Sequence, residues 1–201
     1  QSRDFELFTG KAECKEKLIN SLNEQRGVGQ SSSQFYFDIT PKTHQLAILE
    51  KLSVERSVHN RFKNLVVAAT GTGKTIISAF DFKTVYEKNP NAHFLFVAHR
   101  EEILKQAQSA YRGVLKNNDF GELWVGNYKP QRYNQLFASI QTLNSQIESL
   151  NLTPDYYDYI VIDEVHHVSA ASYRAILNHF TPTVLLGLTA TPERQDGANI
   201  L

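Results

Sequence analysis

The sequence predicts an α/β fold in which a parallel sheet carries helices on both faces. Two observations lead to this class. Apolar runs of strand length alternate with segments of helical periodicity, and the apolar runs are continuous, as in strands that are buried on both faces. In such sheets ligands bind beyond the carboxyl ends of the strands. The loops that follow the strands are therefore where we expect the functional residues.

The elements are expected in a regular order along the chain. A first helix starts at Thr40-Pro41, a good N-cap and first-turn pair, and continues with apolar residues at 46, 49 and 52. Strands are then expected over residues 64–69, 93–98, 136–140, 159–163 and 183–188. Helices are expected over residues 75–87, 101–115 and 169–180, with one more from the end of the third strand to about residue 150.

The first part of the chain differs from the rest. Residues 11–23 have the pattern of a short helix, and residues 27–33 are a Gly/Ser-rich stretch typical of a flexible linker. We expect residues 1–33 to be the tail of a preceding domain and residues 34–201 to form the main domain. The sequence contains no Met, and its end carries no closing signal, so we expect a piece of a longer protein.

Composition sets further bounds on function. Lys plus Arg and Asp plus Glu each number 21, so net charge is no evidence for or against a polyanionic partner. Cys14 is the single cysteine, which excludes an intrachain disulfide and a multi-cysteine metal site. This usage suits a cytoplasmic protein. No apolar run approaches the ~18 residues that a membrane helix needs.

A phosphate-binding loop is predicted between the first strand and the next helix. Residues 68–75 read Ala-Ala-Thr-Gly-Thr-Gly-Lys-Thr, which matches the phosphate-loop pattern with Ala68 in place of the first glycine. The glycines let backbone N–H groups surround phosphate oxygens, and the helix dipole favours the same anion. Lys74 would reach the β- and γ-phosphates, and Thr75 would ligate Mg²⁺. The nucleotide-binding candidates here are Thr70, Gly71, Thr72, Gly73, Lys74 and Thr75.

Two adjacent acids, Asp163 and Glu164, stand at the carboxyl end of the buried strand over residues 159–163. Adjacent carboxylates repel each other unless a cation neutralises them. Asp163 can hold Mg²⁺ through its water shell, and Glu164 can polarise the attacking water. Glu164, Lys74 and Asp163 are therefore the catalytic candidates, and Thr75 and Asp163 are the metal candidates. His166 is interpreted as a polar link between the nucleotide and the moving parts, because metal-ligand spacing is missing around it.

The ordered set of motifs resembles the first RecA-like lobe of superfamily-two helicases. The phosphate loop comes first, Asp163-Glu164-Val165-His166 resembles the DEAH-type variant of the DEAD/DEAH box, and Thr189-Ala190-Thr191-Pro192 follows. The resemblance spans residues 35–201. The stretch Ala98-His99-Arg100-Glu101-Glu102-Ile103-Leu104 is most similar to bacterial type III restriction-subunit-like helicases.

This resemblance implies further roles. ATP and Mg²⁺ would be the cofactors, with Gln45 reading adenine, and Arg100 and Thr142 would contact a nucleic-acid backbone. His166, Thr189 and Thr191 would couple the ATP state to strand binding. A second RecA-like lobe, which no part of this sequence matches, would supply arginines to the ATP site. We therefore expect the 201-residue chain alone to be nearly inactive as an ATPase.

Three functions remain open from the sequence. The first is an ATP-driven helicase or translocase acting on DNA, with RNA as the other possible substrate. The second is a nucleotide-gated nucleic-acid-binding switch with little turnover. The third is another phosphate-loop enzyme such as a small-molecule kinase. The Thr-Ala-Thr motif after the acidic strand argues against the kinase, for which the sequence also offers no acceptor site or lid.

Overall fold

The computed structural model describes residues 38–164 and 170–190. The chain divides into two units, Gln1–Phe35 and Tyr36–Leu201. The first unit lies outside the described residues, and so do the helix and linker expected there. None of the helices in the described part of the chain combines the length and the apolarity that crossing a membrane requires.

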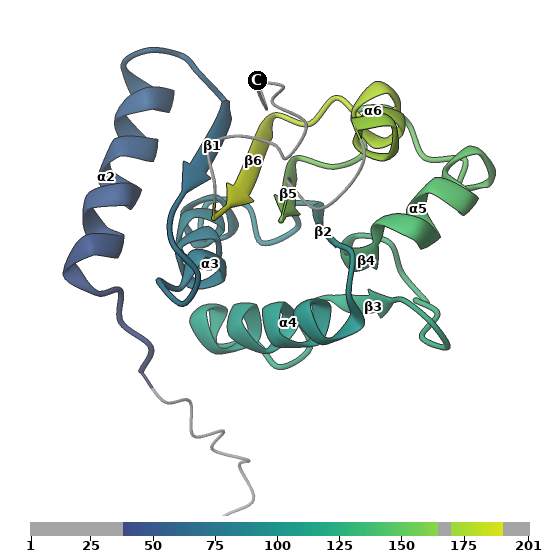
Figure 1. The fold of residues 1–201 in the computed structure, drawn as a ribbon, viewed down its shortest axis with the longest axis horizontal. Coiled ribbons are helices and arrows are strands. Elements are labelled where there is room, and N and C mark those ends of the chain that lie inside the picture. The colour runs from purple at the N-terminus through teal and green to yellow at the C-terminus, as the bar shows by residue number, and fades with distance from the viewer. Residues whose placement is uncertain (1–37, 165–169, 191–201) are drawn as a thin grey trace, which may run out of the picture. The chain divides into compact units, whose positions relative to one another are not determined.

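The second unit is built on a parallel sheet (Figure 1). Its strands run in the order β1-β6-β5-β2-β4-β3, and every neighbouring pair is parallel. All carboxyl ends therefore lie at one edge, which we call the carboxyl edge. The bounds are β1 (Lys63–Val67), β2 (Phe94–Ala98), β3 (Glu122–Trp124), β4 (Gln135–Ser139), β5 (Tyr159–Asp163) and β6 (Val184–Thr189).

Helices cover both faces of the sheet, which confirms the predicted fold class (Figure 1). They are α2 (Thr43–Ser57), α3 (Lys74–Tyr86), α4 (Glu101–Leu115), α5 (Ile140–Gln146) and α6 (Ala170–His179). In β2, Phe94 and Phe96 join the core beneath α3 and α4. Leu95 and Val97 join a second core with residues of α5 and α6. The period of two in a strand causes this division between the faces.

Aromatic rings fill the larger core and fix the helix that follows the phosphate loop. Phe82 of α3 lies with its ring centroid 4.5 Å from that of Phe94 and 5.3 Å from that of Tyr159. All three residues are fully buried. Fully burying one such side chain contributes about 1.5–3 kcal/mol to stability. The C-terminal half of α3 is thereby packed against the amino ends of β2 and β5, and this packing fixes the helix on the sheet.

Three details of the predicted elements were wrong. Helix α2 begins at Thr43 with Lys42 as its N-cap rather than at Thr40-Pro41, because the side chain of Gln45 accepts a hydrogen bond from the Lys42 N–H. Ile140 begins α5 rather than ending a strand, because the Ser139 hydroxyl caps that helix. The short edge strand β3 was not predicted, since three residues carry too little periodicity.

Candidate functional site

The phosphate loop lies between β1 and α3 and has the backbone that its glycines permit. Gly71 and Gly73 have φ values of +82° and +81°, which residues that carry a Cβ rarely adopt. Lys74 is the first residue of α3, and its Nζ donates to the carbonyl oxygen of Ala68 at 3.0 Å. The Thr72 hydroxyl donates to Ala69 O at 2.7 Å. The loop is thus closed by its own hydrogen bonds beside the positive end of the α3 dipole.

Two carboxylates stand at the carboxyl end of β5. Asp163 is buried, and this burial, reinforced by the charge of Glu164, raises its pKa to about 6, while the Glu164 N–H and the charge of Lys74 act in the opposite direction. The Glu164 N–H donates to Asp163 Oδ1 at 2.9 Å. Glu164 has a φ of +53°, a left-handed conformation that costs a non-glycine residue energy and is common at functional sites.

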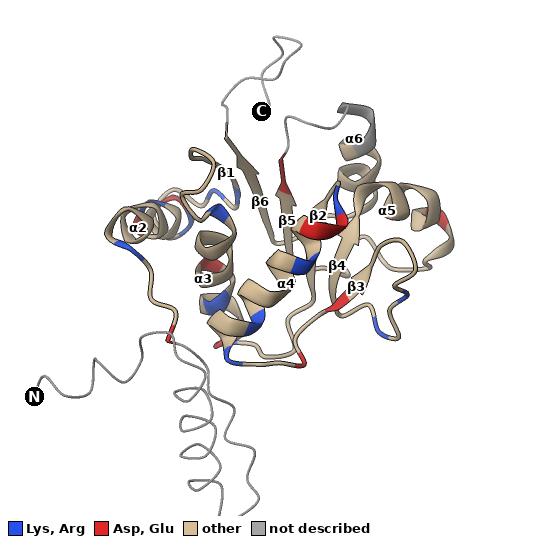
Figure 2. Cartoon of the chain, turned by 60° about the horizontal axis from the view of Figure 1, so that its bottom comes forward, with Lys and Arg blue, Asp and Glu red and all other residues tan. Residues whose placement is uncertain are grey.

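Most of the predicted nucleotide and metal residues meet in one cavity. Figure 2 shows the acidic end of β5 and the basic first turn of α3 on the same side of the sheet. A cavity of about 370 Å³ lies there, lined by Thr70, Gly71, Gly73, Lys74, Thr75, Asp163 and Glu164, together with Ile103, Gln106 and Ala190. Ile103 and Gln106 were not predicted. They lie one turn into α4, where helical periodicity alone does not distinguish a site residue from a surface residue.

The donor atoms in this cavity suit magnesium. Asp163 supplies carboxylate oxygens and Thr75 a hydroxyl, which are the hard oxygen ligands that Mg²⁺ prefers beside phosphate and water. Burial raises the pKa of Asp163, and a cation bound beside it would stabilise the charged form of the carboxylate. Among the described residues, no cluster of three or more His, Cys, Asp or Glu that could hold a metal ion is found.

Gln45 is close to the loop, with both ends of its amide hydrogen-bonded within the protein. Its Oε1 accepts from the Lys42 N–H at 2.9 Å, and its Nε2 donates to Thr72 O at 3.0 Å. The side chain is buried, and it is so close to Gly73 that a Cβ there would lie 2.5 Å from Nε2. Nε2 of His44 lies 3.1 Å from the same Thr72 oxygen, a contact that was not predicted. Reading adenine remains a prediction for Gln45, and it would require these hydrogen bonds to be exchanged.

The two predicted nucleic-acid contacts follow the carboxyl ends of two neighbouring strands. Ala98 of β2 pairs with Ser139 of β4, so Arg100 and Thr142 follow the carboxyl ends of adjacent strands. Arg100 is exposed at the N-cap of α4. Thr142 lies in the first turn of α5, where its N–H donates to Ser139 Oγ and its hydroxyl lies 2.7 Å from the same oxygen. Neither residue lines the nucleotide cavity.

Of the predicted coupling residues, the structure describes only Thr189. His166 and Thr191 lie outside the described residues. Thr189 ends β6, is fully buried, and accepts a hydrogen bond from the Ala68 N–H at its carbonyl oxygen, at 3.0 Å. This bond ties the end of β6 directly to the start of the phosphate loop.

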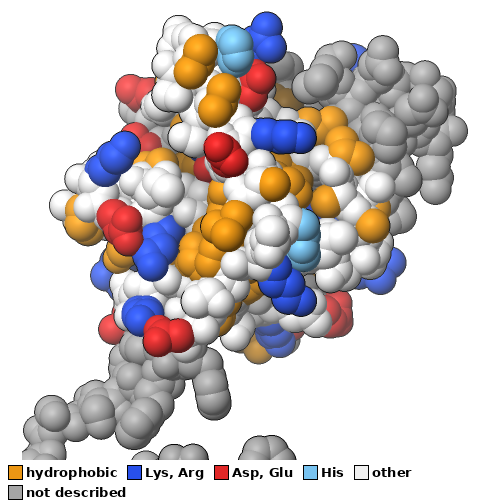
Figure 3. All heavy atoms as spheres, turned by 90° about the vertical axis from the view of Figure 1, so that its left-hand side faces the viewer, with side chains coloured by type: hydrophobic (Ala, Val, Ile, Leu, Met, Phe, Trp, Pro, Cys, Tyr) orange, Lys and Arg blue, Asp and Glu red, His pale blue; other side chains and the backbone are white. Residues whose placement is uncertain are grey.

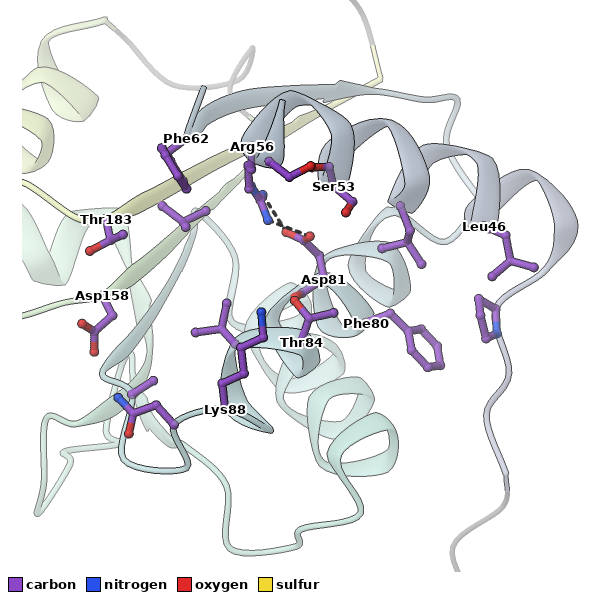
Figure 4. Close-up of a pocket in the computed structure, with 17 residues that line it drawn as sticks. Leu46, Ser53, Arg56, Phe62, Phe80, Asp81, Thr84, Lys88, Asp158 and Thr183 are labelled. Atoms are coloured by element: carbon purple, nitrogen blue, oxygen red, sulfur yellow. Dashed lines mark hydrogen bonds and ion pairs between the residues drawn. The ribbon is translucent and has the colours of Figure 1, made fainter. Parts of the chain in front are cut away.

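A larger cavity of about 870 Å³ lies away from this site, between α2, α3 and the amino ends of β5 and β6 (Figure 4). At its base Arg56 forms a two-pronged ion pair with Asp81, with both N–O distances 2.8 Å. The Tyr159 hydroxyl also donates to Asp81. Viewed from the side of α2, hydrophobic side chains gather in a hollow near the centre of the face (Figure 3). None of the predicted site residues lines this cavity.

The chain matches a known family over most of its length. Residues 38–194 match the family described as "Type III restriction enzyme, res subunit". A type I restriction enzyme EcoAI endonuclease subunit from Escherichia coli is 30% identical over 178 residues, which is 80% of this chain and 21% of that protein. The chain thus spans about a fifth of the length of this relative.

Solved structures share the fold at lower identity. The UvsW helicase from bacteriophage T4 has a TM-score of 0.66 and 17% identity, over 90% of this chain and 63% of that chain. The SWI2/SNF2 ATPase core of Sulfolobus solfataricus, solved in complex with double-stranded DNA, has a TM-score of 0.62 and 15% identity, over 82% of this chain and 35% of that chain. The chain belongs to the type III restriction enzyme res-subunit family and has the N-terminal RecA-like fold of a superfamily-two helicase.

Proposed function

We propose that this chain is the ATP-binding lobe of an ATP-dependent DNA helicase or translocase, and that residues 34–201 form this lobe. The observation that carries the proposal is the convergence of Lys74, Thr75, Asp163 and Glu164 on one cavity at the carboxyl edge. Nucleotides bind at this edge of α/β sheets. The family match over residues 38–194 supports ATP-dependent action on nucleic acid.

In the proposed mechanism each residue has its own task. Lys74 and the N–H groups of the phosphate loop bind and orient the β- and γ-phosphates. Thr75 and Asp163 would hold Mg²⁺, which would neutralise charge on the phosphates when bound. Glu164, which lines the same cavity, orients the attacking water and accepts its proton. Its left-handed backbone turns the chain directly after Asp163, so that the two adjacent carboxylates serve different partners.

DNA is proposed as the substrate rather than RNA. The E. coli relative is described as a restriction endonuclease subunit, and the archaeal structure was solved with double-stranded DNA. The exposed guanidinium of Arg100 and the hydroxyl of Thr142 can donate hydrogen bonds to phosphate oxygens. These oxygens are present in a nucleic acid of any sequence. A second RecA-like lobe and a preceding domain of the intact protein are the other proposed partners.

The test is nucleic-acid-stimulated ATP hydrolysis by the intact protein. We expect stimulation by DNA of unrelated sequences, and loss of turnover with retained ATP binding in Glu164→Gln. Stimulation by RNA alone would change the substrate to RNA. ATP binding that alters DNA affinity without turnover, in wild type as well as in Glu164→Gln, would replace the motor with a nucleotide-gated switch.

A further inference from the structure

A tight turn after β3 presents an aromatic ring on the surface. The Tyr128 N–H donates to Val125 O at 2.9 Å, and the two residues form an antiparallel bridge. Gly126 has a φ of +56°, the left-handed conformation that a two-residue turn of this kind requires. Val125 is buried, while residues 126–129 are all exposed. The turn is therefore anchored at its base and carries Tyr128 outward.

The ring of Tyr128 is held in place on one side by α4. The ammonium of Lys105 lies 4.7 Å from the centroid of the ring, a cation–π contact, and is itself 2.7 Å from Glu101 Oε1. A Cβ added to Gly126 would lie 3.2 Å from Glu101 Oε2, so the turn abuts the first turn of α4. Despite these contacts, Tyr128 remains 45% exposed. One side of the ring is supported, and much of the remainder faces solvent.

The turn lies at the same edge of the sheet as the proposed backbone contacts. Trp124, the last residue of β3, pairs with Ala138 of β4, and the next residue of β4 pairs with Ala98 of β2. Arg100, Thr142 and Tyr128 thus follow the carboxyl ends of three neighbouring strands, which are about 4.8 Å apart. Arg100 directly precedes Glu101, the residue that positions Lys105 and the turn.

We propose that Tyr128 is a stacking platform for a base of single-stranded nucleic acid whose backbone runs past Arg100 and Thr142. This inference rests on the proposed function, and it adds a base contact where only phosphate contacts were expected. Every base has a π-face, so the contact would be independent of sequence. A ring immobilised by Lys105 loses little conformational freedom on binding. Duplex bases are already stacked on one another, which makes the single strand the ligand of this ring.

Binding by the full 201-residue chain tests the platform. The probes are fluorescein-labelled single-stranded oligonucleotides of two unrelated sequences, followed by anisotropy across a salt series. We expect Tyr128→Ala to weaken binding about 5- to 150-fold. Tyr128→Phe should bind like wild type, because it keeps the ring. Phe62→Ala is the matched control, since Phe62 is an exposed aromatic that precedes β1 at the opposite edge of the sheet.

The salt dependence separates stacking from charge. Loss of one phosphate contact in Arg100→Ala should reduce the slope of log K against log salt by about 0.7 for a single strand. Tyr128→Ala should leave this slope unchanged, because it removes no charge. A 2-aminopurine base in the oligonucleotide should be quenched on binding to wild type and less so on binding to Tyr128→Ala.

The outcomes distinguish this inference from the function beneath it. Wild-type affinity in Tyr128→Ala, with Arg100→Ala weakened, would overturn the platform and leave the proposed function standing. Weakening in Phe62→Ala equal to that in Tyr128→Ala would also overturn it, because the effect would then be unspecific. If the wild-type chain binds no single strand even at low salt, both the platform and the proposed strand path are wrong. Far-UV circular dichroism checks that each variant is folded.

Discussion

The Nδ1 atom of His99 lies 2.9 Å from the Glu164 Oε2 atom, within ion-pair distance. His99 follows β2 and directly precedes Arg100, the proposed backbone contact, whereas Glu164 follows β5 and lines the nucleotide cavity. β2 and β5 are neighbours in the sheet. The contact therefore connects a residue of the nucleotide cavity with the segment that carries Arg100.

His99→Ala in the intact protein should lower nucleic-acid-stimulated turnover more than it changes ATP affinity. The Nδ1 atom of His99 lies 2.9 Å from Glu164 Oε2, and His99 does not line the nucleotide cavity. We expect kcat to fall about 10-fold or more, with KM for ATP within a factor of two or three, since a misplaced base costs rate rather than binding. Steady-state ATPase assays measure both. The exposed His59 provides a matched control variant, His59→Ala, which should behave like wild type.

Glu164→Gln should stop hydrolysis while ATP stays bound. The amide keeps the size of the side chain but cannot accept a proton, and general-base catalysis contributes about 10²–10⁴-fold. Single-turnover hydrolysis and equilibrium binding of labelled ATP separate the two effects. Turnover at the wild-type rate would mean that another group acts as the base.

Lys74→Ala should instead weaken nucleotide binding itself. The variant removes the ammonium, which lies 3.0 Å from Ala68 O at the base of the loop and would otherwise pair with the phosphates. Because no other Lys or Arg lines the cavity within the described residues, we expect a loss of at least about 10-fold in ATP affinity. The same binding assay tests this prediction. Lys83→Ala is the control, because Lys83 lies in the last turn of α3, at the other end of the helix from Lys74. Unchanged affinity would contradict the assignment.

Two glycines of the loop form a matched pair for testing the role of Gln45. Gly71 and Gly73 have nearly the same φ, so alanine at either position carries similar backbone strain of about 1–2 kcal/mol. A Cβ at Gly71 meets no atom within 4 Å, whereas one at Gly73 meets Gln45 Nε2 at 2.5 Å. Gly73→Ala should therefore destabilise the chain by about 1–3 kcal/mol more than Gly71→Ala.

Urea unfolding of the 201-residue chain measures this difference. In a Gln45→Ala background the difference between the two alanine variants should largely disappear, because the clashing amide is gone. A difference that persists without Gln45 would show that the loop resists a side chain at Gly73 for another reason.

Asp81→Ala should be strongly destabilising. Arg56 and Asp81 are both largely buried, and removing one partner leaves the other charge uncompensated. Such losses typically cost about 3–5 kcal/mol. The exposed pair Lys83–Glu87 on the same helix gives the control, where Glu87→Ala should cost less than about 1 kcal/mol. Urea midpoints of both variants test the prediction, and equal losses would contradict it.

The sequence was informative where chemistry is local and less so where contacts are distant. Continuous apolar runs predicted five of the strands, and the helix predicted from Thr75 begins one residue earlier, at Lys74. The contact between His99 and Glu164 joins residues 65 positions apart, and no local pattern encodes it. The Arg56–Asp81 pair is similar, since each residue alone has the character of an ordinary charge on a helix. Tyr128 was missed because the turn that presents it depends on the unpredicted strand β3.

The 201-residue chain alone should hydrolyse ATP very slowly. Phosphoryl transfer builds charge on the γ-phosphoryl oxygens, and an arginine from a facing domain is typically worth about 10³–10⁵ in rate. Among the described residues that line the nucleotide cavity, Lys74 is the only cation. Arg100, the nearest arginine in sequence to a cavity residue of α4, caps that helix and is exposed outside the cavity. Water that enters an open site also weakens each electrostatic contact through its high dielectric constant.

Steady-state hydrolysis by the purified chain, with and without DNA and beside the intact protein, tests this expectation. We expect the chain to bind ATP, because the phosphate loop and the acidic strand end are both present, yet to turn it over at least about 10³-fold more slowly than the stimulated intact protein. Adding the proposed second RecA-like lobe as a separate polypeptide should restore part of the rate, and an arginine-to-alanine variant of that lobe should not. Comparable DNA-stimulated turnover by the chain alone would mean that the charge on the γ-phosphate is neutralised from within this lobe, and the division of the catalytic site between two lobes would be wrong.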